Sequence, residues 1–143
     1  MIVPDVNLLL YSQFTAYREH AAARRWWEEL MNGDEPVALT APAVFGFVRL
    51  STSARVFDRP LGVEACLDPV EEWLRRPHVS VLPPGARHFD VAFRLLRHVG
   101  TAGNLTTDVQ LAAFAIEHQA VLHSNDTDFG RFDGLRWVNS LRR

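Results

Sequence analysis

The sequence predicts an α/β fold in which a short central parallel sheet is flanked by helices. Short apolar segments alternate with longer helical patterns along the chain, an alternation that is typical of parallel sheets covered by helices. The expected strands are continuous apolar runs, as strands buried on both faces require. The length of 143 residues, without a repeat or a linker, fits one domain over residues 1–143 that buries its own core.

Strands and helices can be assigned along the whole chain. The predicted strands are the apolar runs at residues 2–4, 37–39, 79–82, 120–123 and 135–138. The predicted helices carry apolar residues at helical spacing and cover residues 19–31, 43–53, 63–75, 86–99 and 107–118, with a helix or turn at 7–12. Pro42 favours a helix start, and Pro69 is expected to bend or restart the helix that contains it.

Composition excludes several classes of protein. The single cysteine, Cys66, rules out an internal disulfide framework and a cysteine-built zinc site within one chain. All fifteen basic side chains are arginine, which excludes enzymes that depend on a P-loop, kinase or Schiff-base lysine. The N-terminus shows no signal peptide, and no apolar run approaches the roughly 18 residues of a membrane span. We therefore expect a cytoplasmic protein without a membrane partner.

Four aspartates stand at the ends of predicted strands and helices. Asp5 follows the first strand, and Asp126 and Asp128 follow the strand at 120–123. Asp108 opens the helix before that strand, in a predicted capping box with Thr107 as N-cap. Any one of them alone is more simply a turn residue or a partner of the helix dipole.

Taken together, the four aspartates predict a metal site. The carboxyl ends of parallel strands share one edge of the sheet, so the four carboxylates are expected to meet there. Clustered carboxylates repel one another until a cation binds them, and oxygen ligands without cysteine favour Mg²⁺ or Mn²⁺. Such a site activates water for attack on a phosphodiester. We interpret Asp5, Asp108 and Asp126 as metal ligands and Asp128 as a fourth catalytic acid.

Three segments of the chain resemble the motifs of PIN-domain ribonucleases, and most closely those of VapC-type toxins. They are IVPDVN at residues 2–7, NLTTD at 104–108 and SNDTDF at 124–129. The resemblance implies a PIN-domain fold and an Mg²⁺- or Mn²⁺-dependent endoribonuclease that cleaves structured RNA such as transfer or ribosomal RNA. It also implies a homodimer that a VapB-type antitoxin inhibits.

The resemblance also assigns individual roles. Asp5, Asp108 and Asp126 carry over as metal ligands, and Asn7, Thr107 and Ser124 as groups that support them by hydrogen bonds. The chain departs from the family pattern at residues 43–53, where a glutamate is common and no acid is present. Either Asp128 supplies the missing charge, or metal binding is weaker, or the domain is inactive.

Some side chains outside the acidic motifs have two interpretations. Arg24 either binds RNA or flanks a surface for the antitoxin, and Arg49 either lies near phosphate or serves the edge of the core. His20 and His123 are weaker candidates for phosphate contact. The adjacent Trp26 and Trp27 are not expected to face one core together. They and the aromatic residues Tyr11, Phe14 and Tyr17 belong either to the core or to a groove for a helical antitoxin segment.

Two other functions compete with the nuclease. A catalytically impaired PIN-like module that binds RNA or a partner would explain the missing glutamate. Against it, buried like charges bring no gain to a pure binder. A phosphatase of the haloacid dehalogenase type requires Asp-x-Asp after its first strand and a lysine. Here Asn7 stands where the second aspartate is required, and the chain contains no lysine, so the sequence disfavours that enzyme.

Overall fold

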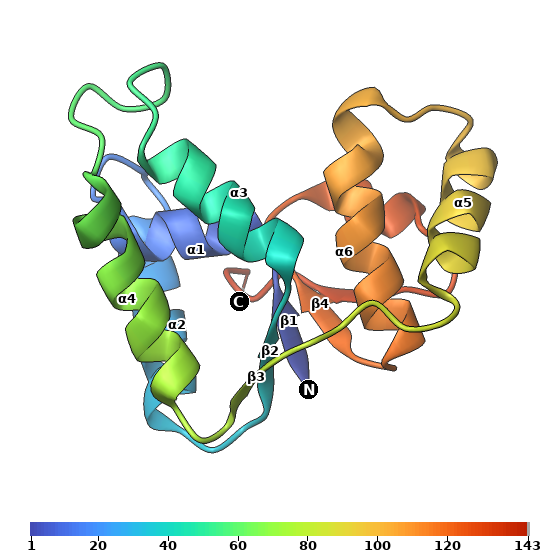
Figure 1. Ribbon diagram of the computed structural model, residues 1–143, viewed down its shortest axis with the longest axis horizontal. Helices are drawn as coiled ribbons and strands as arrows, with labels where there is room; N and C mark the ends of the chain where they lie inside the picture. Colours follow the sequence, from blue (N-terminus) through green and yellow to red (C-terminus); the bar gives the residue numbers. More distant parts are fainter. Residues whose placement is uncertain (143) are drawn as a thin grey trace.

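A computed structural model describes residues 1–142 and confirms the predicted α/β class with a parallel sheet. The strands are β1 (Ile2–Pro4), β2 (Val37–Leu39), β3 (Val79–Val81), β4 (Val121–His123) and β5 (Arg136–Val138). The helices are α1 (Val6–Gln13), α2 (His20–Asn32), α3 (Ala41–Ser51), α4 (Val63–Arg75), α5 (His88–Val99) and α6 (Thr106–Glu117), with short 3₁₀ turns η1 (Gly103–Leu105) and η2 (Thr127–Arg131). In Figure 1 the sheet lies between α1 to α4 on one side and α5 and α6 on the other.

The order of the strands creates a crevice beside the first one. The sheet runs β3-β2-β1-β4-β5, with every neighbouring pair parallel. The chain therefore leaves β1 toward one edge of the sheet and returns through α5 and α6 to place β4 on the other side of β1. Connections that diverge from two adjacent strands leave a space beyond their carboxyl ends, where α/β proteins bind ligands. Pro4 pairs with His123 at this end, so Asp5 and Ser124 emerge side by side.

Strands β1 and β2 are fully buried, β4 is partly buried, and the edge strands β3 and β5 are the most exposed. Every residue of β1 and β2 is buried. In the edge strands Val81 is 59% exposed and Val138 is 45% exposed. The prediction that the strands are buried on both faces is therefore correct for β1 and β2 and wrong for β3 and β5, because the helical layers cover the centre of the sheet more fully than its edges.

Helix α6 forms much of the core on its side of the sheet. Its residues from Leu111 to Ala115 are all buried, as the apolar pattern predicts. Three of these five side chains are alanines with no exposed surface. Small side chains allow a helix to lie close to the layer beneath it. This close packing fixes the helix that carries Asp108.

Two helices begin or continue differently from the prediction. Helix α3 begins at Ala41, because the Thr40 hydroxyl accepts a hydrogen bond from the Ala43 N–H at 3.3 Å and caps the helix two residues earlier than expected. Helix α4 runs through Pro69 as one element, so the predicted restart there is wrong. Proline lacks the N–H that would bond to the carbonyl of Ala65, and the rest of the helix compensates for that loss.

The adjacent tryptophans of α2 correct another prediction, because both pack against the same core. Trp27 is buried and packs edge-on against Trp73, with ring centroids 5.2 Å apart. Trp26 is partly buried and stacks on His123 of β4 at 5.7 Å. The helix meets the core over an arc wide enough to include both rings. Among residues 1–142, no helix is long and apolar enough to cross a membrane.

Candidate metal centre

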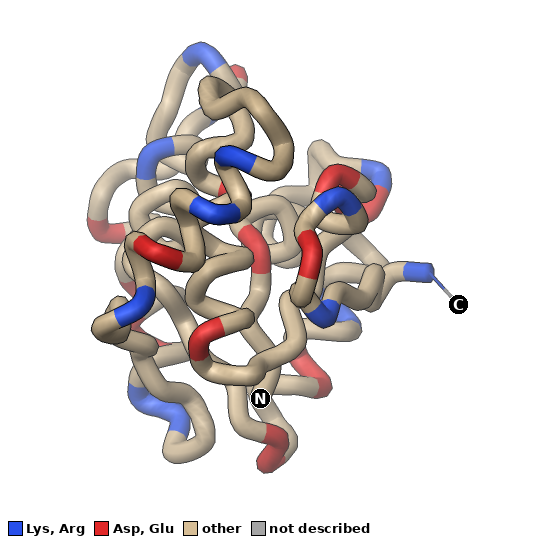
Figure 2. Tube along the Cα trace, turned by 90° about the vertical axis from the view of Figure 1, so that its right-hand side faces the viewer, with Lys and Arg blue, Asp and Glu red and all other residues tan. Residues whose placement is uncertain are grey.

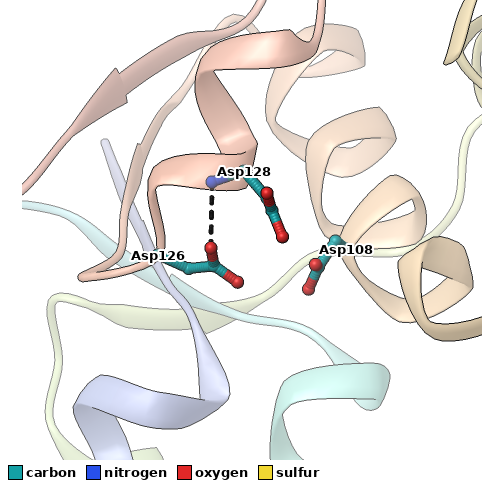
Figure 3. A group of neighbouring side chains, drawn as sticks. All are labelled: Asp108, Asp126 and Asp128. Atoms are coloured by element: carbon teal, nitrogen blue, oxygen red, sulfur yellow. Dashed lines mark hydrogen bonds between the residues drawn. The ribbon is translucent and has the colours of Figure 1, made fainter.

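Three carboxylates meet beyond the carboxyl end of the sheet. Asp108, Asp126 and Asp128 each present an oxygen, and these oxygens lie within 4.8 Å of one another. Figure 3 shows Asp108 extending from the first turn of α6 toward Asp126 and Asp128, which come from the segment after β4. All three side chains are half-buried, so solvent and a ligand can reach them. A spacing of this size suits oxygen ligands around one cation.

Asp5 lies beside this group and is held more rigidly. It is only 6% exposed and is the N-cap of α1. Its Oδ1 accepts a hydrogen bond from the Val6 N–H at 2.7 Å, and its Oδ2 accepts one from the Ser124 hydroxyl at 2.7 Å. The predicted convergence of Asp5 with Asp108 and Asp126 is therefore present. The set with mutual ligand spacing, however, contains Asp128 instead of Asp5.

The segment after β4 is fixed by its own hydrogen bonds. The Ser124 hydroxyl accepts a bond from the Asp126 N–H at 2.9 Å while it donates to Asp5. Asp126 Oδ1 accepts a bond from the Asp128 N–H at 2.9 Å, which is the dashed line in Figure 3. Asp side chains favour this local turn. It opens η2 and brings Asp126 and Asp128 to the same side.

The start of α6 differs from the predicted capping box. The N-cap is Leu105, without a side-chain hydrogen bond, and the helix begins at Thr106 after the turn η1. Thr107 therefore lies inside the first turn and is exposed. Asp108 remains in the first turn, where the positive end of the helix dipole favours a carboxylate. The predicted place of Asp108 in the first turn is therefore correct, although the capping box on which that prediction rested is absent.

Burial and mutual repulsion raise the pKa of two of the carboxyl groups. Burial raises the pKa of Asp5 to about 6, a rise that the bonds from Ser124 and Val6 limit and the charge of Asp126 increases. The pKa of Asp108 rises to about 7, through burial first and then through the charges of Asp5, Asp126 and Asp128. Within residues 1–142, no arginine or histidine forms an ion pair with any of the four. Among the described residues, no basic side chain at ion-pair distance offsets their charge.

The PIN domain family matches residues 2–135 of the chain. The chain belongs to the PIN-domain family. It is 51% identical over 142 residues to Ribonuclease VapC33 of Mycobacterium tuberculosis, covering 99% of both chains. It is 38% identical to Ribonuclease VapC43 of the same organism, covering 99% of this chain and 96% of that one. These relatives identify the VapC branch of the family, as the sequence motifs predicted.

Solved structures share the fold of this PIN domain. VapBC2 of Rickettsia felis, bound to a DNA fragment from its promoter, matches with a TM-score of 0.68 at 19% identity, covering 97% of this chain and 98% of that one. VapC20 of Mycobacterium tuberculosis, a Sarcin-Ricin loop cleaving toxin, also matches with a TM-score of 0.68, at 17% identity and with 95% and 99% coverage. At such identities the likeness establishes the PIN fold alone.

The three residues expected to support the carboxylates have different surroundings in this PIN domain. Ser124 contacts both Asp5 and Asp126, as described above. Asn7 donates from Nδ2 to the Ser124 hydroxyl at 3.5 Å, and its Oδ1 is buried without a hydrogen-bond partner. In the described part of the chain, Thr107 takes part in none of the hydrogen bonds around the cluster. Its predicted supporting role is therefore not reflected in the geometry.

At one position of α3, Gly46, there is no room for a glutamate or any other side chain unless a neighbouring side chain moves. Gly46 packs against the residue that follows Asp5, and a Cβ added there would lie 2.8 Å from Cγ2 of Val6. This contact brings α3 close to the acidic edge without contributing charge. The fourth acid of the site, Asp128, comes instead from η2.

The basic candidates do not form part of the cluster. Arg24 is exposed on α2 and forms an ion pair with Glu28 at 2.8 Å. Arg49 is exposed on α3 and has no ion pair among residues 1–142. Figure 2 shows the arginines distributed over many helices and loops rather than gathered into one stripe. RNA binding by these two arginines stays a prediction.

The two histidines have other contacts. Nδ1 of His20 lies 2.7 Å from the carbonyl oxygen of Tyr11, a hydrogen bond that joins α2 to α1. His123 is half-buried beneath Trp26, and burial lowers its pKa. A neutral, stacked imidazole is a poor phosphate ligand, so the structure gives no support to His123 in that role.

One feature of the site was not predicted from the sequence. Burial, and then the charges of Glu19, Asp5 and Asp126, raise the pKa of the Tyr11 hydroxyl, and the Asn125 side chain limits that rise. Tyr11 stands four residues after Asn7 on α1, a spacing that places both side chains on one face of the helix. That spacing was the available signal, but Tyr11 was assigned to the core or a partner groove.

Proposed function

We propose that this chain is a metal-dependent endoribonuclease toxin that cleaves structured RNA, such as transfer or ribosomal RNA, and that a VapB-type antitoxin neutralises it. The observation that carries the proposal is the group of Asp5, Asp108, Asp126 and Asp128 at the carboxyl edge of the sheet, with which no basic side chain of residues 1–142 forms an ion pair. The relatives named ribonucleases support the reaction class, and the complexes of VapC with VapB support the partner. Cytoplasmic location and a homodimer remain predictions that accompany it.

The residues present suit a hard divalent cation. Every group directed at the site is an oxygen donor, which favours Mg²⁺ or Mn²⁺ over zinc. Burial is the main cause of the raised pKa of Asp5 and Asp108, and the charges of the neighbouring aspartates add to it; a bound cation would relieve that repulsion. The buried Asn7 Oδ1 without a partner adds another oxygen that a hydrated cation can satisfy through water.

The protein supplies position and protonation state. Asp108, Asp126 and Asp128 would hold the ion, and Asp5 would complete the ligand set with the lone pairs that remain after its two hydrogen bonds. Ser124 orients Asp5 and the Asp126 backbone at the same time. A bound Mg²⁺ or Mn²⁺ lowers the pKa of a water and stabilises charge on the phosphodiester. In this arrangement Asp128 supplies the charge that α3 lacks.

The test is RNA cleavage with matched aspartate variants. Purified protein should cut bacterial transfer or ribosomal RNA in Mg²⁺ or Mn²⁺, and EDTA should stop it. Asp126→Asn and Asp128→Asn should each lower kcat/KM by at least about a hundredfold, in the range found when charged groups at a metal site are removed. Asp58→Asn, at an exposed loop position, is the control. Full activity of Asp128→Asn would remove Asp128 from the site.

An impaired binding module is the second candidate, and the absence of an acid from α3 is the observation that favours it. Titration calorimetry separates the two, since a nuclease site must bind Mg²⁺ or Mn²⁺ and a binding module need not. No heat of binding at millimolar ion, with RNA still bound, would support the module. Copurification with the neighbouring antitoxin gene product and light scattering of the purified chain test the partner and the dimer.

A further inference from the structure

The acidic turn, residues 124–128, is held by strand β5 as well as by Asp5. The Ser124 N–H donates to the carbonyl oxygen of Val138 at 3.1 Å, so the pairing of β4 with β5 continues into the start of the turn. The Ser124 carbonyl oxygen accepts a hydrogen bond from Nε1 of Trp137 at 3.0 Å. Because the hydroxyl of the same residue donates to Asp5, Ser124 joins the acidic edge to β5.

The indole ring of Trp137 also contacts the chain beyond the turn. A Cβ added to Gly130 would lie 3.6 Å from Cζ3 and 3.9 Å from Cε3 of Trp137, so the ring lies against the backbone of η2 at that residue. Asp126 and Asp128 stand between Ser124 and Gly130 in the sequence. A single side chain of β5 therefore touches the chain both before and after these two carboxylates.

Asn139 provides a second contact from the segment that follows β5. Its Nδ2 donates to Oδ1 of Asn125 at 3.1 Å, and its own Oδ1 accepts a hydrogen bond from the Leu141 N–H at 3.1 Å. The bond from Leu141 fixes the Asn139 amide in a local turn of the kind that asparagine favours. Trp137 and Asn139 thus hold two successive residues of the acidic turn from the same side.

The acidic turn needs support from outside itself. Asp108, Asp126 and Asp128 present oxygens within 4.8 Å of one another, and in the described part of the chain no basic side chain forms an ion pair with them. Like charges at this spacing repel one another until a cation binds. The hydrogen bond from the Asp128 N–H to Asp126 lies within the turn and does not fix it to the sheet. Resting on the proposed metal-dependent function, we propose that Trp137 and Asn139 are positioning residues, which hold the acidic turn at ligand spacing before a divalent cation binds.

Trp137→Phe tests this role, because it removes the indole N–H and keeps an aromatic ring at the same place. In EDTA, the amide hydrogens of Asp126 and Asp128 should exchange about three- to tenfold faster by NMR, as the loss of one hydrogen bond allows, while those of α2 exchange as in the wild type. The Kd for Mn²⁺, measured by titration calorimetry, should rise by a similar factor. Saturating Mn²⁺ should restore kcat for RNA cleavage, because the bound ion then holds the turn.

Two further variants separate positioning from general stability. Trp27→Phe deletes an indole N–H that is buried in the core and has no hydrogen-bond partner among the described residues. It should lower Tm, because a buried ring becomes smaller, and leave both the Mn²⁺ affinity and the exchange of the acidic turn unchanged. Asn139→Ala should change exchange and Mn²⁺ affinity in the same direction as Trp137→Phe, and it takes the place of that variant if Trp137→Phe does not fold.

Wild-type exchange in the acidic turn and wild-type Mn²⁺ affinity in both Trp137→Phe and Asn139→Ala would overturn the assignment. Equal effects of Trp27→Phe would also overturn it, since general destabilisation would then be the cause. If the wild type neither binds Mn²⁺ nor cuts RNA, the proposed function fails by itself. Exchange in EDTA still decides the positioning role in that case: faster exchange confined to the acidic turn would support it, and an unchanged or uniform rate would refute it.

Discussion

Asp108→Asn should make the metal-free protein more stable at about pH 8. The pKa of Asp108 is about 7 in the folded chain, against an ordinary value of 3.8. At 1.36 kcal/mol for each pKa unit, the full difference corresponds to about 4 kcal/mol of stability lost through ionisation. Asp108 is only half-buried, so solvent screening reduces the expected gain to roughly 1–2 kcal/mol. Asparagine keeps the shape of the side chain and removes the charge.

The gain should depend on pH in a defined window. Between about pH 4 and pH 7 the folded wild type binds more protons than the unfolded chain, so its stability falls as pH rises through this range. The cost of Asp108 is absent below about pH 4 and complete above about pH 7. The difference between variant and wild type should therefore grow with pH and then level off.

The assay is urea denaturation in EDTA at about pH 5 and about pH 8, with the exposed-site variant Asp58→Asn as control. Added Mg²⁺ should stabilise the wild type and leave Asp108→Asn almost unchanged, because only a ligand that binds the folded state raises its stability. A variant that is less stable than the wild type at about pH 8, or a difference that does not vary with pH, would show that repulsion among the carboxylates does not govern this site.

Three further changes test the surroundings of the site. Ser124→Ala should cost about 1–3 kcal/mol in urea denaturation, and should shift the acid limb of the activity–pH profile upward, because the hydroxyl that lowers the pKa of Asp5 is lost. An unchanged profile would contradict this. Gly46→Ala should cost about 1 kcal/mol or more despite the better helix propensity of alanine, since the new Cβ would lie 2.8 Å from Val6 Cγ2; a higher Tm would show that Val6 yields. Glu117→Ala should lower Tm at neutral pH, and the difference from the wild type should shrink as the pH falls below the ordinary range of a glutamate. Burial alone would raise the pKa of Glu117, but two backbone N–H bonds outweigh it and lower that pKa, so the contribution is lost as pH falls through the folded value.

The apolar pattern predicted the elements well because burial decides them. The bounds of β1, β2 and α4 agree with the prediction at both ends, and the other helices and strands differ by one or two residues. The largest difference at a helix start with a side-chain cap is that of α3, which Thr40 caps. A cap depends on the backbone angles of one residue, which periodicity does not report.

The aspartates of the site could be predicted from the sequence, but which of their oxygens lie close together could not. The order of the strands brings Asp5 and Asp126 to one edge, and that follows from a parallel sheet. Which oxygens reach ligand spacing depends on the local turn from Asp126 to Asp128, and this turn replaced Asp5 by Asp128 in the closest group.

The central position of β1 has a consequence for biosynthesis. This strand precedes both of its neighbours in the chain, and β4 begins only at Val121. A growing chain that ends before Val121 has β1 unpaired on that side and lacks Asp126 and Asp128. The acidic edge is therefore incomplete in a nascent chain until the segment after β4 has been made.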